Sequence, residues 1–339
     1  MFAVRLHITI YNSMIFVYLM SKNPKISICV VTQDNANYIE KLLNSIKKLK
    51  YLEILDIVIV DNHSNDSTRE IINQFKGKMN INYTYAEERR PLPANRNLCV
   101  QKSIGDIIVM VDSDVEFIQP EFIDNIISIF VKYKEIAILS PIIIDSKTGL
   151  AQSLGLKKLL HIPYIFTFNF PGSNPDELHK LINLKLFKID MIHGACFIFR
   201  KSIFTDINGF DEYMVPYNFD EMDFAIRAQL HGYQLFASST VEIFHYGGGT
   251  TRGFKSESRA ELFISHGMRS IIRNYSKKLV YGTLIFFLFM TSATFKLVVD
   301  LKERFSPLII FRSVLWALNH KNLPIRNVEE FKIIESSNK

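Results

Sequence analysis

The sequence is poor in cysteine and contains neither of the two common glycine-rich phosphate loops. Its three cysteines, Cys29, Cys99 and Cys196, stand singly within apolar stretches. This pattern is typical of buried reduced thiols and excludes a disulfide framework or a cysteine-rich zinc site, which favours a reducing compartment. The sequence has no Gly-x-x-x-x-Gly-Lys loop and no Gly-x-Gly-x-x-Gly fingerprint, so a nucleotide site in this chain must be built differently.

The sequence also lacks an N-terminal segment long enough to span a membrane. Residues 1–20 are apolar, but their longest run, residues 14–20, is too short to cross a bilayer, and no small-residue cleavage site follows it. We expect residues 1–24 to be an extension ahead of the folded chain, with Met20 as the natural start. A weak signal anchor is the alternative interpretation.

The rest of the chain has the composition of a large folded protein. The 339 residues are 48% hydrophobic and carry a net charge of +6, so the chain can bury a sizeable core, and its length allows about two domains. Predominantly apolar runs at residues 26–31, 54–60 and 107–111 are typical of strands buried on both faces, and stretches with helical spacing separate them. This alternation predicts an α/β fold with a doubly wound, mostly parallel sheet flanked by helices.

Polar residues follow each of these strands. Parallel strands end at one edge of a sheet, so we expect the side chains near these ends to share one cleft. They are Asp34, Asp61, Arg96, Asp112 and Asp114. Two carboxylates one residue apart can hold a divalent ion and leave positions open for phosphate oxygens. The pattern predicts a metal-bound nucleoside diphosphate, and we expect no nucleic-acid partner.

Each of these residues also has a structural interpretation. Asp112-Ser113-Asp114 is an ordinary turn sequence as well, because Asp and Ser bond to nearby backbone groups. Asp34 and Asp66 are suited to cap helices, and Arg96 to lie on the surface at the start of a helix. It is their combination that favours a nucleotide site.

Several motifs in the same order resemble those of family 2 glycosyltransferases, which have the GT-A fold. They lie at residues 28–32, 58–66, 95–97, 105–114, 194–200, 209–211, 220–227, 232–233 and 245–249. The resemblance covers residues 25–253, and its second half is similar to rhamnosyltransferase-like members. It implies a nucleotide-binding half over residues 25–120 and an acceptor half over residues 121–253. In the latter half, Pro163, Pro171 and Pro175 mark loops that we expect to shape the acceptor pocket.

The resemblance implies roles for individual residues of the donor site. The nucleotide-sugar site would consist of Thr32, Asp34, Asp61, Arg96 and Asp112. Within it, Asp61 corresponds to the aspartate that reads the base. Asp112 and Asp114 correspond to the Asp-x-Asp motif that binds Mg²⁺ or Mn²⁺ at the diphosphate, and His245 to a metal or diphosphate contact. A histidine at a strand end is otherwise an ordinary hydrogen-bonded residue.

The general base that the resemblance implies is Glu221. The family usually shows Glu-Asp where this chain has Asp220-Glu221, so Asp220 stays an alternative. A sugar hydroxyl needs such a carboxylate to take its proton, whereas acidic residues at a helix start also complement the helix dipole. Asp223 and Arg227, four residues apart, are typical of a surface or structural pair.

Beyond residue 253 the sequence changes character. Seven basic residues lie between residues 252 and 278, and residues 279–295 form an uncharged run at the short limit for spanning a bilayer. This pattern favours a basic, apolar and helical region over residues 254–339 that associates with the cytoplasmic face of the cell membrane. A helical subdomain packed on the catalytic core is the alternative.

Together these features predict an inverting, metal-assisted enzyme. It would move a hexosyl or deoxyhexosyl group from a nucleoside-diphosphate sugar to a hydroxyl of a glycan or lipid-linked acceptor. A sugar nucleotidyltransferase is an alternative, but it would carry a Gly-rich basic loop after the first strand, which residues 32–35 do not form. A non-catalytic nucleotide-sugar-binding module is another, and it would be expected to lack the metal or base carboxylates that are present here.

Overall fold

The computed structural model describes residues 24–155, 157–158, 166–167, 183–247, 256–275, 307–320, 322 and 333–335. Residues 1–23 of the proposed N-terminal extension, the uncharged run at residues 279–295 and the three prolines Pro163, Pro171 and Pro175 lie outside these residues.

The first half of the chain alternates strands and helices as the sequence predicts. Its elements are β1 (Ile26–Thr32), α2 (Ala36–Ile46), β2 (Asp56–Asp61), α3 (Thr68–Lys76), β3 (Ile81–Ala86), α4 (Leu92–Lys102) and β4 (Ile107–Asp112). Strands β2, β1 and β4 are neighbours and parallel, with Thr32 beside Asp61 and Val31 beside Asp112. The loops that follow them therefore open on one edge of the sheet, which confirms the prediction.

The second half completes the sheet with strands of both directions. Its elements are β5 (Val115–Phe117), α5 (Phe122–Lys132), β6 (Ile136–Asp145), β7 (Ala151–Ser153), β10 (Leu186–Ile189), β11 (Cys196–Arg200), α7 (Lys201–Asp206), α8 (Asp220–Leu230) and β12 (Gln234–His245). In the described part of the chain the sheet order is β10-β12-β6-β11-β4-β1-β2-β3-β13, where β13 is Ile333–Glu335. The short strands β8 (Lys157–Lys158) and β9 (Phe166–Thr167) pair separately.

The expectation of a mostly parallel sheet is wrong for this half. Strand β11 lies between β4 and β6 and is antiparallel to both. It begins at the edge where β4 ends, since Cys196 pairs with Val111. An apolar run that is buried on both faces looks the same in either direction, so its sequence does not reveal which way it runs. The fold is a mixed α/β sheet with flanking helices.

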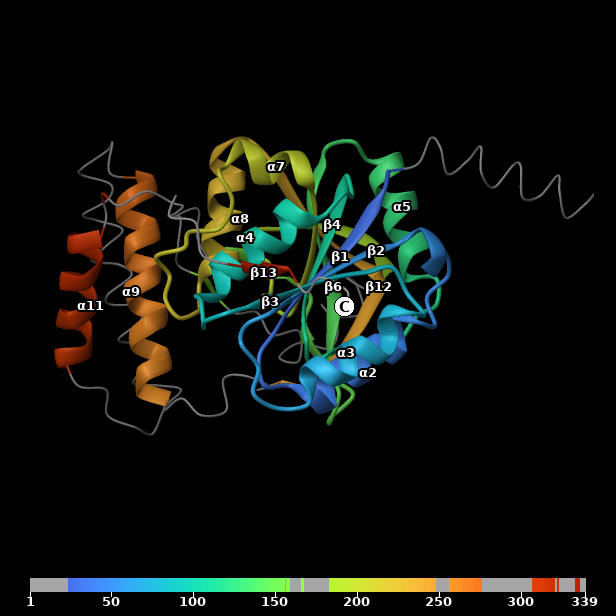
Figure 1. Ribbon diagram of the computed structural model, residues 1–339. Coiled ribbons are helices and arrows are strands. Elements are labelled where there is room, and N and C mark those ends of the chain that lie inside the picture. The colour runs from blue at the N-terminus through green and yellow to red at the C-terminus, as the bar shows by residue number, and fades with distance from the viewer. Residues whose placement is uncertain are drawn as a thin grey trace, which may run out of the picture.

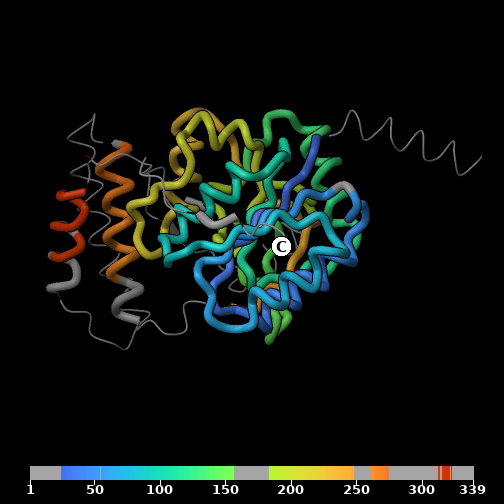
Figure 2. Tube along the Cα trace, in the orientation of Figure 1, coloured from blue at the N-terminus to red at the C-terminus, as the bar shows by residue number. Residues whose placement is uncertain are grey.

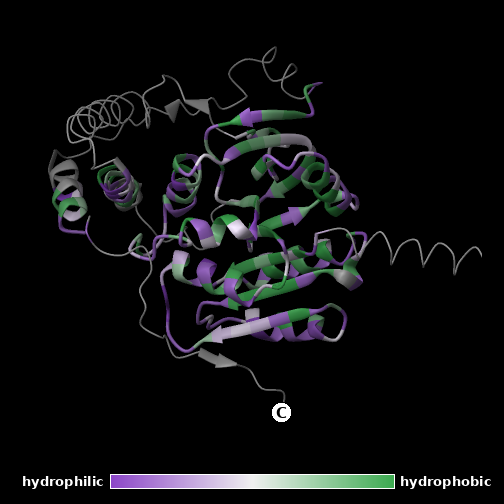
Figure 3. Cartoon of the chain, turned by 90° about the horizontal axis from the view of Figure 1, so that it is seen from above, coloured by the Kyte–Doolittle hydropathy of each residue, from purple (hydrophilic) through white to green (hydrophobic). Residues whose placement is uncertain are grey.

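The sheet lies between two apolar layers. Alternate strand residues face each layer, so that Ile28 belongs to the cluster that includes residues of α2, α3 and α5, whereas Cys29 belongs to the cluster that includes residues of α4, α7 and α8. Figure 3 shows the central strands as the most hydrophobic part of the molecule, and Figure 1 shows helices on both sides of them. Each buried Leu, Ile or Phe side chain stabilises the fold by about 1.5–3 kcal/mol relative to an exposed one. The strand ends at the rim of this core are consequently held in fixed positions.

Two further helices, α9 (Ser256–Tyr275) and α11 (Pro307–His320), lie side by side at one end of the molecule (Figures 1 and 2). Ile264, Met268 and Ile271 of α9 join the core layer of α8, as expected for a helical subdomain packed on the core. Arg269 does not belong to a lipid-facing basic surface, because it is fully buried against Asp211. Among the described residues, no helix has the length and apolarity needed to cross a membrane.

Candidate active site

The pairing of two strands brings the Asp112-Ser113-Asp114 turn next to His245. Asp112 ends β4, and the turn leads directly into β5, which pairs with β12 so that Val115 lies opposite His245. His245 Nε2 lies 3.5 Å from Asp114 Oδ1, and its Nδ1 lies 2.8 Å from Gln152 Oε1. Burial lowers the pKa of His245, but the hydrogen bond and charge of Asp114 outweigh it, so that the pKa is raised.

Asp114 and His245 fit one side of a divalent-metal site. Their donor atoms lie close together and both residues line a cavity, and a carboxylate with an imidazole suits Mn²⁺ better than Mg²⁺, which prefers oxygen ligands. Asp112 turns its carboxylate toward Arg96 instead. Within the described ranges, no three His, Cys, Asp or Glu side chains are grouped to bind a metal. Oxygens of a bound diphosphate or of water could supply further ligands.

Arg96 connects the two halves of the site from the first turns of α4. Its Nη1 donates to Asp220 Oδ2 at 2.7 Å, and its Nη2 donates to Asp112 Oδ1 at 3.0 Å and to the Gly194 carbonyl at 3.1 Å. Burial lowers the pKa of Arg96, but the two carboxylates raise it further than burial lowers it. The alternative of a surface residue at a helix start is wrong, because Arg96 is buried.

The two acidic residues at the start of α8, Asp220 and Glu221, lie in different environments. Asp220 is fully buried against Arg96. The side chain of Glu221 is 15% exposed and lines the cavity, with its Oε2 at 3.9 Å from Arg96 Nη1. Burial, followed by the negative charge of Asp220, raises the pKa of Glu221 to about 8. A carboxylate with this pKa can take up a proton near neutral pH.

Gly194 leaves space for this carboxylate. A Cβ atom at residue 194 would lie 3.1 Å from the Glu221 carboxyl carbon, which is closer than ordinary van der Waals contact. The Gly194 carbonyl is also the third partner of Arg96. The glycine that precedes β11 thus allows Arg96 and Glu221 to approach the same stretch of backbone.

Asp61 and Asp34 are both engaged with neighbouring protein groups. The carboxylate of Asp61 is buried and accepts hydrogen bonds from the Tyr83 hydroxyl at 2.8 Å and from the Ser64 N–H at 2.9 Å. Burial raises its pKa despite these bonds. Asp34 forms an ion pair with Arg89 and accepts the Asn65 N–H at 2.7 Å. Asp34 lines the cavity, whereas Asp61 is fully buried and is not among the lining residues.

The helix-capping role falls to Asp66 and not to Asp34. Asp66 accepts the N–H of Ala36, the first residue of α2, and that of Thr68, the first residue of α3, each at 3.0 Å. These bonds hold the loops after β1 and β2 together. The helix-cap interpretation of Asp66 is confirmed, whereas the one for Asp34 is wrong, because its carboxylate is turned toward Asn65 and Arg89.

The pair of Asp223 and Arg227 is structural and buried. Arg227 Nε donates to Asp223 Oδ2 at 2.6 Å, and both side chains are at most 4% exposed. The structural interpretation is confirmed, and the alternative of a surface pair is wrong.

Sequence reasoning missed three polar residues that shape the site. Asn62 joins three loops, because its amide bonds to the Gln33 side chain and to both backbone groups of Arg90. His193 lies edge-on to His245, with ring centres 5.7 Å apart, and burial lowers its pKa to about 4. Gln152 orients His245. Asn62 belongs to the polar stretch after the second predicted strand, so its position could have been noticed in the sequence. The sequence around His193 and Gln152 contains nothing that indicates a site.

These residues surround a cavity of about 940 Å³ at the carboxyl edge of the sheet, a volume suited to a small ligand. Its lining includes Thr32, Asp34, Asn62, Arg96, Asp112, Asp114, His193, Glu221 and His245. Thr32 offers a buried hydroxyl that finds no hydrogen-bond partner among the described residues. Buried polar groups are normally paired, so this hydroxyl is suited to contact a ligand.

The model of the family described as Glycosyl transferase family 2 matches residues 27–207, which is more than half of the chain. The chain belongs to glycosyl transferase family 2. It is therefore an enzyme of glycosyl transfer, as the sequence predicted. The matched segment contains β1 to β11 with the Asp112-Ser113-Asp114 turn. The rhamnosyltransferase-like subgroup stays a prediction.

Relatives with established names support this membership. The poly(ribitol-phosphate) β-N-acetylglucosaminyltransferase TarS of Staphylococcus aureus is 32% identical over 92 residues, which cover 26% of this chain and 16% of that enzyme. The sequence match therefore spans only about a sixth of the length of TarS.

Solved structures show the same fold. Residues 1–349 of S. aureus TarS in complex with UDP-GlcNAc give a TM-score of 0.58 at 18% identity, with 88% of this chain and 80% of that one covered. The mannosyltransferase PcManGT of Pyrobaculum calidifontis, in complex with GDP-Man and Mn²⁺, gives a TM-score of 0.55 at 14% identity, with 89% and 88% covered. At these identities the likeness shows the GT-A fold alone.

Proposed function

We propose that this glycosyltransferase moves a sugar from a nucleoside-diphosphate donor to a hydroxyl group of a glycan or lipid-linked acceptor, with inversion at the anomeric carbon. The observation that supports this most directly is the position of Glu221. Its carboxylate lines the same cavity as the Asp114–His245 pair, and burial raises its pKa to about 8. The proposed base, Glu221, and the proposed site for the anionic leaving group, Asp114 with His245, thus line one cavity.

In this proposal Glu221, Asp220 and Arg96 have different roles. Glu221 accepts the proton of the acceptor hydroxyl while that oxygen attacks the anomeric carbon. A single in-line displacement inverts that carbon. Asp220 does not serve as the base, because its carboxylate is buried and holds the Arg96 guanidinium. Arg96 in turn fixes Asp112 at the other side of the cavity.

A bound divalent ion would offset the charge that develops on the departing nucleoside diphosphate. Asp114 and His245 would hold it, and Mn²⁺ suits this donor pair better than Mg²⁺ does. The presence of Mn²⁺ and GDP-Man in the solved complex of PcManGT supports this part of the proposal. The donor that we propose to test first is UDP-N-acetylglucosamine, because TarS binds it.

We also propose that the enzyme works at the cytoplasmic face of the membrane on a lipid-linked acceptor. The support is the basic stretch before residues 279–295, and that run lies outside the described residues. Vesicle flotation with anionic and neutral lipids tests this part separately.

A thermal-shift titration with UDP, GDP, dTDP and CMP, each with and without Mn²⁺, tests the donor site. We expect one diphosphate to raise the melting temperature only when Mn²⁺ is present. The Asp114→Asn variant should lose this rise. The Asp206→Asn variant, whose carboxylate pairs with Tyr233 outside the cavity, should keep it. No rise with any nucleotide, together with no release of UDP from UDP-N-acetylglucosamine, would overturn the proposal.

A further inference from the structure

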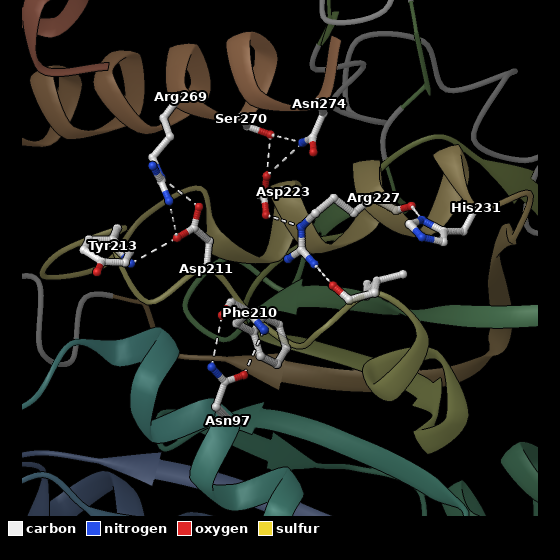
Figure 4. A network of polar contacts seen from close by, with 11 residues as sticks. Asn97, Phe210, Asp211, Tyr213, Asp223, Arg227, His231, Arg269, Ser270 and Asn274 are labelled. Atoms are coloured by element: carbon white, nitrogen blue, oxygen red, sulfur yellow. Dashed lines mark hydrogen bonds and ion pairs between the residues drawn. The ribbon is translucent and has the colours of Figure 1, made fainter. Parts of the chain in front are cut away.

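Helix α9 holds the chain on both sides of the acidic pair Asp220–Glu221. Ahead of the pair, Arg269 donates to both carboxylate oxygens of Asp211, from Nε at 2.8 Å and from Nη2 at 3.0 Å. Behind it, the Ser270 hydroxyl donates to Asp223 Oδ1 at 2.5 Å (Figure 4). The segment that carries Glu221 is therefore fastened to α9 at its two ends.

Between these two points the backbone is strained. Asn218 and Phe219, the two residues before Asp220, have φ angles of 89° and 71°. Residues other than glycine rarely adopt this left-handed region, and they stay in it only where the surroundings hold them there. The strained turn directs α8 so that Asp220 meets Arg96 and Glu221 faces the cavity.

The groups that hold this turn also come from α9. His266 Nδ1 lies 2.8 Å from the carbonyl oxygen of Asn218. The Phe263 ring stands edge-on to the Phe219 ring, with centres 5.1 Å apart. Each of the two strained residues thus has its own contact on one face of α9.

His266 is fixed in one protonation state and one orientation. Burial lowers its pKa to about 4, so the ring is neutral at physiological pH. An N–H must face a carbonyl oxygen, so the tautomer with the proton on Nδ1 bonds to Asn218, while a backbone hydrogen bond to Val215 also acts to raise the pKa of the ring. Trp316 of α11 packs against the ring, with centres 5.2 Å apart. In the Nδ1-protonated tautomer the imidazole donates to Asn218.

We propose that His266 is a positioning residue for glycosyl transfer: its Nδ1–H holds the Asn218 carbonyl and thereby the turn that aims Glu221 at the acceptor. The inference rests on the proposed role of Glu221 as the base. His266 touches neither the Asp114–His245 pair nor the loops after β1 and β2. Loss of its hydrogen bond should therefore lower kcat and leave donor binding intact.

Three substitutions separate the hydrogen bond from the bulk of the ring. His266→Asn keeps a donor at the place of Nδ1, because the Asn side-chain nitrogen is also attached to Cγ. His266→Gln moves the donor one atom further, and His266→Leu removes it. His231→Leu is the matched control, since His231 Nδ1 bonds to the Arg227 carbonyl at 2.9 Å at the C-terminal end of α8, far from Glu221 at its start.

The experiment measures release of UDP from UDP-N-acetylglucosamine with Mn²⁺ across pH 6–10, together with hydrogen exchange at residues 218–222. We expect His266→Leu and His266→Gln to lower kcat at least about tenfold, because a small misplacement of a catalytic group is costly. Their KM for the donor should stay within about twofold. The pH of half-maximal activity should shift, and exchange at residues 218–222 should become faster. His266→Asn and His231→Leu should behave as wild type.

Wild-type kcat, pH profile and exchange in a folded His266→Leu variant would overturn the inference. A drop in kcat that is equally large in His266→Asn would overturn it as well, since the ring and not its hydrogen bond would then matter. A wild-type enzyme that neither binds UDP with Mn²⁺ nor releases UDP is a different result. That outcome removes the proposed function itself.

Discussion

Arg96 and Asp220 form a buried ion pair that joins the two halves of the active site across 124 positions of sequence. Arg96 Nη1 lies 2.7 Å from Asp220 Oδ2, and the two side chains are 3% and 1% exposed. This pair accounts for the different roles of two adjacent carboxylates. Asp220 neutralises the guanidinium, and Glu221 is left to face the cavity.

Removal of Arg96 should cost far more stability than removal of a surface arginine. In Arg96→Met the buried Asp220 carboxylate loses its partner, which should lower the free energy of unfolding by about 3–5 kcal/mol. Arg89→Met is the control, because the Arg89–Asp34 pair is largely exposed and should contribute only about 0–1 kcal/mol. Urea unfolding at pH 7 measures both, and equal losses would contradict the prediction.

Glu221→Gln should stop transfer without weakening donor binding. A positioned general base contributes about 10²–10⁴-fold to the rate, so kcat should fall within this range, while Mn²⁺-dependent UDP affinity should stay unchanged. Glu242→Gln is a suitable control, because Glu242 is also a glutamate whose pKa is raised by burial, yet it lies outside the cavity lining. Near-normal kcat in Glu221→Gln would assign the base elsewhere.

The activity should rise with pH through about 8. Burial and the charge of Asp220 raise the pKa of Glu221 to about 8, and only the deprotonated carboxylate can accept a proton. Below that pH, kcat/KM should fall about tenfold per pH unit. A rate profile between pH 6 and 10 measures this, and a midpoint near the ordinary glutamate value would contradict it.

Glu221 should also make the fold less stable at high pH. Its pKa is raised in the folded state, so its contribution to stability is present below the unfolded value of 4.5 and is lost as the pH rises through about 8. Glu221→Gln avoids this loss because it has no charge. Even a rise of about one pKa unit corresponds to about 1.4 kcal/mol. At pH 9 the free energy of unfolding of Glu221→Gln should therefore exceed that of the wild type by about this amount, which is about 2–4 °C in melting temperature. An equal difference at pH 5 and pH 9 would contradict this account.

The sequence was informative wherever a signal is local. The strands β1, β2 and β4 are mostly apolar because both of their faces are buried, and polar residues mark the loops after them. Because neighbouring parallel strands end at the same edge of a sheet, we could also predict that these loops meet there. Asp112 and Asp114 could therefore be placed at one cleft in advance, whereas Glu221 was assigned only through the family resemblance.

What the sequence could not reveal depends on partners that are far apart in the chain. Arg96 pairs with Asp220 and Arg269 with Asp211, 58 positions away, and neither arginine differs locally from a surface residue. Asp61 is held by Tyr83, whose hydroxyl reaches it from the neighbouring strand β3. The direction of β11 was equally hidden, since burial on both faces removes any alternation from its sequence.

The antiparallel position of β11 has a consequence for synthesis on the ribosome. Strands β1 to β4 are contiguous in sequence and can pair as soon as they emerge, since N-terminal units fold first during synthesis. Strand β4 nevertheless keeps one open edge until β11, more than eighty residues later, is translated. The partner of Asp114 arrives later still, at the end of β12. A nascent chain that stalls between these points exposes an apolar strand edge, the kind of surface that chaperones recognise and that favours aggregation.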